Sequence, residues 1–264
     1  MDPKPGGSEE RPLVSLRRDG LKLPSPTCVG SHEMRWLSTN QVRYLSVVVV
    51  VLIWTLGAYI SLTDQAFVES VASSLTGLAL FASGSGIVIL LVIAGLLWLS
   101  GENLGDIGFT SEHLGRQLGI GTLFGFALFI LHQVLISPVI DVFLPASVAQ
   151  GVDLSLLFDN VYQYPIWIFL AVFTGGLIEE GTRVFGLTRF ENVFGRSGLV
   201  IAAVVGSIVF GIGHLYQGVD SAIGTGIQAV LFILIYLRRR RTLEAVAAHA
   251  VYDIIGITIA YLIY

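Results

Sequence analysis

The chain is poor in charged residues and almost free of cysteine. Lys, Arg, Asp and Glu together make up 13% of the 264 residues, against about 25% in a typical soluble domain. Cys28 is the sole cysteine, which excludes an intramolecular disulfide. Hydrophobic residues make up 54% of the chain and the mean hydropathy is +0.78. This composition excludes an ordinary soluble globular protein and predicts an integral membrane protein.

The first 42 residues lack the apolar run that a signal peptide requires. They are rich in Pro, Gly, Ser and charges of both signs, a composition typical of disordered segments. We therefore predict a disordered cytoplasmic tail over residues 1–42, followed by a single transmembrane domain over residues 43–264.

Apolar windows of about twenty residues recur after the tail, each long enough to cross ~30 Å of hydrocarbon at ~1.5 Å per residue. They predict an all-α, polytopic transmembrane helical bundle with about seven spans, or eight as the alternative. The polar stretch 63–74 is expected to be a loop or an interfacial helix. The seven expected spans are residues 44–62, 75–99, 118–141, 163–190, 198–217, 222–237 and 242–263.

Basic residues predict the orientation, because cytoplasmic loops collect Lys and Arg. With the amino terminus in the cytoplasm, the following all fall on the cytoplasmic side: Arg116, Arg189, Arg196 and the run from Arg238 to Arg241. The expected outer connections contain no Lys or Arg, namely residues 63–74, 142–162 and 218–221. A multi-pass protein of a prokaryotic plasma membrane is the first expectation, and the endoplasmic reticulum is the alternative.

Six ionisable side chains interrupt the last spans. They are Glu179, Glu180, Arg183, His214, His249 and Asp253. A lone charge at the centre of a transmembrane helix costs at least ~2.5 kcal/mol, so an uncompensated set would oppose insertion. We expect these residues to cluster, to satisfy one another and to be functional.

Helix geometry predicts that these groups reach a similar depth. Measured from the expected cytoplasmic ends of their spans, Glu179, His214 and Asp253 lie at ~20, ~24 and ~18 Å. Residues four apart share a helix face, which aligns Glu179 with Arg183 and His249 with Asp253. Two adjacent carboxylates in a low-dielectric site cannot easily both be ionised, so one should hold a proton or pair with the arginine. Such asymmetry is what acid–base catalysis uses.

Five other polar or small residues and the four tryptophans are assigned no catalytic role. Gly121 and Gly125 form a small-xxx-small pair, which predicts close helix packing. His132 and Gln228 lie inside apolar spans and are expected to form interhelical hydrogen bonds. Glu244 is expected to be solvated near the inner interface, and the four tryptophans fit interfacial belts.

Three ordered motifs on successive spans resemble those of the CPBP family, which contains CaaX-processing intramembrane endopeptidases and bacteriocin-immunity relatives. The motifs run from Ile178 to Arg183, from Phe210 to His214 and from His249 to Asp253. The loop from Leu104 to Phe109 is similar to a further family segment. The resemblance therefore covers residues 100–264, the motif-bearing core of a CPBP-like peptidase domain over residues 43–264.

The resemblance implies hydrolysis of a peptide bond in a membrane-embedded or lipidated protein, CaaX-type substrates included, by an activated water. It implies that Glu179 is the general base, that His214 assists it and that Glu180 orients the site. His249 and Asp253 would bind the scissile carbonyl or its tetrahedral intermediate. Water activation also fits the residues themselves, because no activated serine or cysteine nucleophile is evident.

Two positions depart from the family pattern. Two residues separate Glu180 from Arg183, instead of the usual three, which moves Arg183 about 100° around the helix from its usual place. We expect Arg183 to form an ion pair. Asp253 stands where Asn is common, and an aspartate donates a hydrogen bond only when it is protonated.

Several alternatives stay open. Glu179, His214 and His249 could instead bind a divalent metal such as zinc, since catalytic zinc sites use three such ligands and an open position. The same set could serve a proton-coupled carrier, or the chain could be a noncatalytic membrane scaffold or immunity protein. No cofactor and no nucleic-acid partner are expected in the leading interpretation. Nothing in the sequence predicts the substrate's identity or the oligomeric state.

Overall fold

The computed structural model describes residues 38–144, 158 and 160–263. Across these residues the secondary structure is helical and contains no strand, which confirms the predicted all-α class. Residues 1–37 of the expected tail lie outside the described part. The first helix begins at Thr39, where Ser38 and Gln41 form a capping box.

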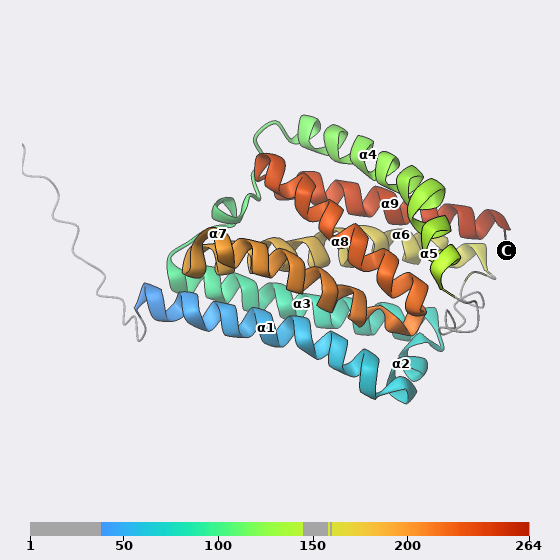
Figure 1. Cartoon of the computed structure of the whole chain (residues 1–264), viewed down its shortest axis with the longest axis horizontal. Coiled ribbons are helices and arrows are strands. Elements are labelled where there is room, and N and C mark those ends of the chain that lie inside the picture. Colours follow the sequence, from blue (N-terminus) through green and yellow to red (C-terminus); the bar gives the residue numbers. More distant parts are fainter. Residues whose placement is uncertain (1–37, 145–157, 159, 264) are drawn as a thin grey trace, which may run out of the picture. The chain divides into compact units, whose positions relative to one another are not determined.

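The described chain consists of long helices joined by short helical turns (Figure 1). The longer ones are α1 (Thr39–Thr63), α3 (Leu75–Ser100), α4 (Leu114–Leu131), α7 (Glu180–Gly213), α8 (Val219–Arg239) and α9 (Thr242–Ile263). The shorter α-helices are α2 (Gln65–Ala72), α5 (Ser137–Phe143) and α6 (Tyr164–Leu170). Two π-helices, η2 (His132–Ile136) and η5 (Ala171–Glu179), and three 3-10 turns, η1 (Leu104–Ile107), η4 (Val161–Gln163) and η6 (Leu215–Gln217), complete the set.

Six helical segments of the described chain are long and apolar enough to cross a membrane. One of them, Val161–Gly213, has 53 residues and would be ~80 Å long if straight, far more than the ~30 Å of a bilayer core. Gly195 interrupts it with φ 64° and ψ −152°. The Arg183 guanidinium lies 4.3 Å from the centroid of the Phe210 ring, although a straight helix would separate these residues by ~40 Å. The segment is therefore a hairpin with two arms, which accounts for the seven expected spans.

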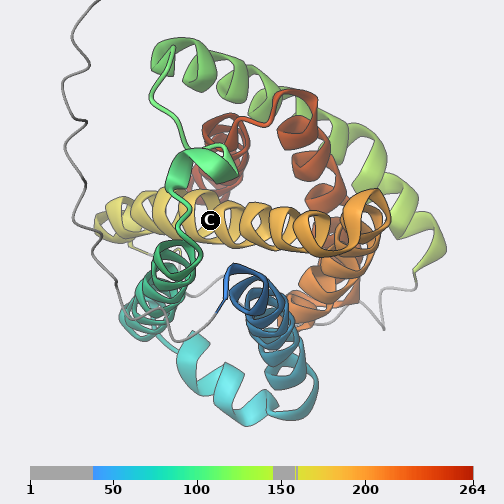
Figure 2. The same ribbon diagram turned by 90° about the vertical axis from the view of Figure 1, so that its left-hand side faces the viewer.

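The hairpin lies at the centre of the described helices. In two perpendicular views the gold-to-orange chain of α6 and α7 runs between α4 and α9 on one side and α1 and α3 on the other (Figure 1, Figure 2). The motifs from Ile178 to Arg183 and from Phe210 to His214 both lie on this hairpin. Its central position surrounds their polar groups with neighbouring helices.

Close contact with α4 and η1 fixes the position of α9. A Cβ at Gly121 would lie 2.6 Å from the Ala247 Cβ, and one at Gly125 would lie 2.6 Å from the Ala248 carbonyl oxygen. The predicted small-xxx-small contact is thus confirmed, because larger residues would separate the two helices. At the start of α9, the Thr242 hydroxyl donates a hydrogen bond of 2.5 Å to the Ile107 carbonyl. Both contacts position the helix that carries the third motif.

Ion pairs at one end of the bundle connect the end of α8 with the helices before and after it. Arg240, the residue that caps α8, forms two hydrogen bonds, of 2.5 and 2.9 Å, with Glu191 of α7. Arg239 donates a bond of 2.7 Å to Glu244, whose side chain is fully buried. The expectation that Glu244 is solvated is therefore wrong. The ion pair with Arg239 compensates the buried charge of Glu244. The five-residue spacing of Arg239 and Glu244 across the α8–α9 turn did not predict this contact.

The turn at Gly195 leads to a stability prediction. Its φ and ψ lie in a region that is essentially restricted to glycine, where other residues are strained by about 1–3 kcal/mol. A Cβ at Gly195 meets no atom within 4 Å, so the cost of Gly195→Ala should come from the backbone alone. We expect a lower thermal unfolding temperature in detergent. Gly115→Ala is the control, because its Cβ also meets nothing and it lies in α4; an equal loss there would contradict this account of the turn.

Candidate active site

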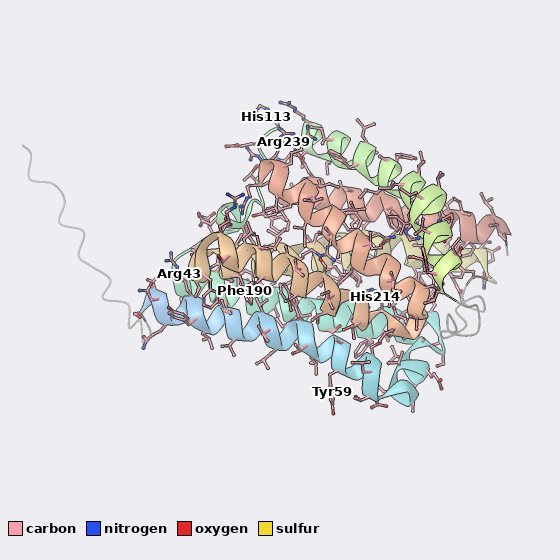
Figure 3. The ribbon with its side chains drawn as sticks, viewed as in Figure 1. Arg43, Tyr59, His113, Phe190, His214 and Arg239 are labelled. Carbon is pink, nitrogen blue, oxygen red and sulfur yellow. The ribbon has the colours of Figure 1, made fainter. Side chains whose placement is uncertain are left out.

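Three chain segments supply the six ionisable residues that the sequence singled out. Glu179 ends the π-helix η5, and Glu180 begins α7. His214 caps the other arm of the hairpin, at the end of α7 in Figure 3. His249 and Asp253 lie one turn apart on α9. Single π-helical stretches are rare and often mark functional sites, and here one leads directly into the first motif.

Glu180 is an anchor between two helices. Its side chain is 1% exposed. The oxygen Oε1 accepts a hydrogen bond from Arg183 Nη1, and the same oxygen lies 2.7 Å from His249 Nδ1. The carboxylate thus compensates the arginine on its own helix and orients an imidazole on α9.

The second nitrogen of the His249 ring faces two other carboxylates. Its Nε2 lies 3.8 Å from Glu179 Oε2 and 3.5 Å from Asp253 Oδ2. These separations leave room for a shared water or a substrate atom rather than a tight direct bond. The ring stacks on Phe232 at 4.4 Å between centroids. Stacking and the Glu180 contact together fix the direction in which Nε2 points.

His214 is oriented by its own helix end. Its Nδ1 lies 2.8 Å from the Phe210 carbonyl oxygen, an acceptor, so Nδ1 carries the proton and donates it. The Phe210 ring lies 4.6 Å from the imidazole. The other ring nitrogen, Nε2, is left for a ligand.

Two cavities adjoin these groups. The larger one, of about 610 Å³, is lined by polar residues from several helices, including Glu179, His214, His249 and Asp253. The smaller one, of about 260 Å³, is lined mainly by apolar residues. Glu179 and His214 line both. Their side chains therefore stand at the boundary between a polar and an apolar compartment.

The larger cavity also contains a neutral hydrogen-bonded network. Gln228 Nε2 lies 2.8 Å from His132 Nδ1 and donates to the Tyr252 hydroxyl. These residues come from η2, α8 and α9, and all three line the cavity. The predicted interhelical hydrogen bond of His132 and Gln228 is confirmed. The addition of Tyr252 was not predicted.

Sequence reasoning gave some residues around the site only a general packing role. Gly175 lies in η5, where a Cβ would collide with Asp253 Oδ2 and would lie 3.5 Å from His249 Nε2. The adjacent Gly175 and Gly176 in the sequence indicate a close helix approach, but they do not identify the partner helix. Phe232 and Trp54 gave no functional signal, because an aromatic residue in an apolar span fits many environments. The Trp54 ring packs against Gly186 and Gly206 and lines the smaller cavity.

Gly175 provides a test of how closely η5 and α9 must fit. Gly175→Ala should push Asp253 and His249 out of position, and a misplacement of about 1 Å can cost about 100-fold in rate. We expect that loss in kcat of the proposed reaction, with little change in thermal stability. Gly84→Ala is the control, since a Cβ there meets no atom within 4 Å. Equal activity of the two variants would show that the close contact is irrelevant to the site.

The metal alternative can be compared with this geometry. Within the described ranges, no group of three or more His, Cys, Asp or Glu side chains is arranged to hold a metal ion. His249 Nδ1 is already occupied by Glu180, so only its Nε2 could bind an ion together with Glu179 and His214. A metal ion at this site would therefore have to use that nitrogen and the two other side chains alone.

Comparison with known families gives an independent observation. Residues 161–255 match the family described as Type II CAAX prenyl endopeptidase Rce1-like. The match confirms the resemblance found in the three motifs. Searches of curated proteins and of solved structures returned no match.

The Rce1-like match covers both arms of the hairpin, all of α8 and the motif on α9. Glu179, Glu180, His214, His249 and Asp253 all lie within it. The family indicates protease activity and membrane-associated substrates of the CAAX type. Together with the candidate spans, it supports an integral, multi-pass membrane protein.

Proposed function

We propose that this chain is an intramembrane endopeptidase that hydrolyses a peptide bond of a CAAX-type, membrane-associated substrate with a water activated by Glu179 and His214. The observation that carries the proposal is the shared position of these two residues. They come from opposite arms of one hairpin and line the same two cavities. A water between them would have a carboxylate to accept its proton and an imidazole to orient it.

The proposed chemistry begins with a water in the larger cavity. His214 Nε2 accepts a hydrogen bond from this water, and Glu179 removes its proton as the oxygen attacks the scissile carbonyl carbon. The carbonyl oxygen becomes an oxyanion, which needs donors placed where the charge develops. Protonated Asp253 can donate one such hydrogen bond, while neutral His249 keeps its Nδ1 proton on Glu180.

Collapse of the intermediate completes the proposed reaction. The C–N bond breaks, and Glu179 returns the proton to the departing amine, so that one water is consumed and a carboxylate and an amine are released. His249 Nε2, 3.5 Å from Asp253 Oδ2, helps to position this oxyanion donor. Glu180 is a positioning residue, because it contacts Arg183 and His249. Arg183 holds Glu180 in place and also lies over the Phe210 ring.

The proposal is tested with purified protein in liposomes and a prenylated peptide with a CAAX-type carboxyl terminus. Mass spectrometry should detect two cleavage products with the unaltered protein and none with His214→Ala. An intact peptide with the unaltered protein would overturn the proposal. Peptide uptake that follows a proton gradient, without cleavage, would support a carrier instead.

The metal-free form of the mechanism has its own prediction. Treatment with a strong chelator should leave the cleavage rate unchanged, because the proposed steps use only side chains and water. Metal analysis of the same preparation serves as the control. Loss of activity on chelation, with recovery on adding zinc, would establish the metal alternative with Glu179, His214 and His249 as the candidate ligands.

A further inference from the structure

The smaller cavity lies between α1, α3, α7 and α8 and has mostly apolar walls. Its volume is about 260 Å³, below the roughly 300–1,000 Å³ that accommodates a drug-sized ligand. It therefore suits one part of a larger molecule. The apolar lining includes Ile53, Trp54, Ala58, Ile89, Ala202 and Ile233.

The polar atoms of this cavity are concentrated where it meets the larger one. Glu179, Phe210 and His214 line both cavities. Arg183 lines the smaller cavity, and its Nη2 is buried without a hydrogen-bond partner in the described part of the chain. An unpaired buried donor is costly unless a ligand or water satisfies it. A peptide supplies carbonyl acceptors for such a donor, whereas a hydrocarbon chain supplies none.

We infer that the smaller cavity is a specificity subsite for the apolar side chain of the substrate residue beside the scissile bond. The inference rests on the proposed endopeptidase function. A scissile carbonyl placed at the boundary formed by Glu179 and His214 lies between two Cα atoms that are only about 3.8 Å apart. The backbone then lies in the larger, polar cavity, and one side chain enters the smaller, apolar one.

Two residues on α1 set the size of this subsite. A Cβ built on Gly206 would lie 3.0 Å from Trp54 Cη2, so the indole fills the space next to that glycine and forms a wall of the cavity. Gly57 also lines the cavity, and a Cβ built there meets no atom within 4 Å. A side chain at position 57 can therefore narrow the subsite without displacing the protein, and a smaller residue at position 54 can widen it.

The first test measures cleavage of prenylated CAAX-type peptides in which only the residue after the prenylated Cys varies, as Ala, Leu or Phe. One methylene in an apolar pocket changes kcat/KM by about 10–200-fold. We expect Gly57→Leu to lower the Leu/Ala ratio of kcat/KM at least 10-fold, and Trp54→Leu to raise the Phe/Leu ratio. Gly84→Leu is the control, because it is an exposed glycine outside both cavities whose Cβ also meets nothing.

The result shows whether the cavity holds a substrate side chain or something else. Unchanged ratios in both α1 variants, with the unaltered protein active, would overturn the inference and leave the proposed function intact. A uniform loss for all three peptides would indicate that the cavity holds the prenyl group or a membrane lipid, and it would equally overturn the inference. The thermal unfolding temperature of each variant shows whether a loss of cleavage activity comes from misfolding.

A second test does not require cleavage. Cys28 is the sole cysteine, so a protein with Cys28→Ser has no thiol. Gly57→Cys then places a single thiol in the cavity. Glu179→Gln is added so that the peptide is bound without being cleaved. An apolar maleimide should label this thiol, and the Leu peptide should slow labelling several-fold more than a peptide with Asp at the same position. Gly84→Cys is the matched control. Equal protection by the Leu and Asp peptides, or equal protection at both thiols, would overturn the subsite even if no cleavage is ever observed.

Discussion

Glu179→Gln should lower kcat for peptide cleavage by about 100- to 10,000-fold, the range expected when a general base is removed. The amide has nearly the same shape but cannot accept the proton of the attacking water. The Glu179 side chain is 24% exposed and faces both cavities, so the fold should tolerate the change. We expect the thermal unfolding temperature to stay the same within about one degree.

The matched control for this variant is Glu112→Gln. That carboxylate is 71% exposed, forms an ion pair of 3.1 Å with Arg241 and lines neither cavity. Exposed ion pairs contribute little to stability, and we expect the loss of this one to leave the cleavage rate unchanged. If Glu179→Gln retained more than about a tenth of the activity of Glu112→Gln, a general-base role for Glu179 would be untenable.

Glu180→Ala should cause the largest loss of stability. The change removes a carboxylate that is 1% exposed and leaves Arg183, 7% exposed, as an unpaired buried charge. Breaking a buried pair by removing one partner typically costs about 3–5 kcal/mol. It also frees His249 from its hydrogen bond to Glu180. We therefore expect a markedly lower unfolding temperature in detergent together with loss of cleavage.

A double variant distinguishes the charge from the lost packing. Glu180→Ala combined with Arg183→Leu removes both charges and should recover much of the stability, although His249 remains unsupported and activity remains low. Glu191→Ala is the control, because its pair with Arg240 is partly exposed and should contribute no more than about 1 kcal/mol. If the double variant were less stable than Glu180→Ala alone, the unpaired arginine would not explain the loss.

The sequence predicted the layer in which the polar residues lie, because that follows from simple physics. Buried charge is costly and a helix advances a fixed length per residue, so Glu179, His214 and Asp253 could be placed at similar depths before any coordinates were known. Periods of apolar residues likewise predicted the spans. The hairpin at Gly195 fits the expected separation of the fourth and fifth spans, because a 53-residue helix cannot fit in a bilayer.

The contacts within that layer could not be predicted in the same way. The π-helix η5 changes the register of the chain just before Glu180, so the α-helical spacing that aligned Glu179 with Arg183 does not show which carboxylate bonds to the arginine. In the structure Glu180 accepts that bond. The Trp54 ring of α1 lies next to the site because Gly186 and Gly206 have no side chains to occupy that space. Such complementarity depends on three distant segments and leaves no pattern in any one of them.

The central claim is that two arms of one hairpin act as a unit on a single water, and a double-mutant cycle tests it most directly. Groups that act together lose their effect together, so their kinetic losses are far from additive. We predict that Glu179→Gln with His214→Ala cleaves a prenylated peptide about as slowly as the worse single variant, with all three proteins folded. Losses in kcat/KM that multiply in full would contradict the account, because they would show that the carboxylate and the imidazole act independently.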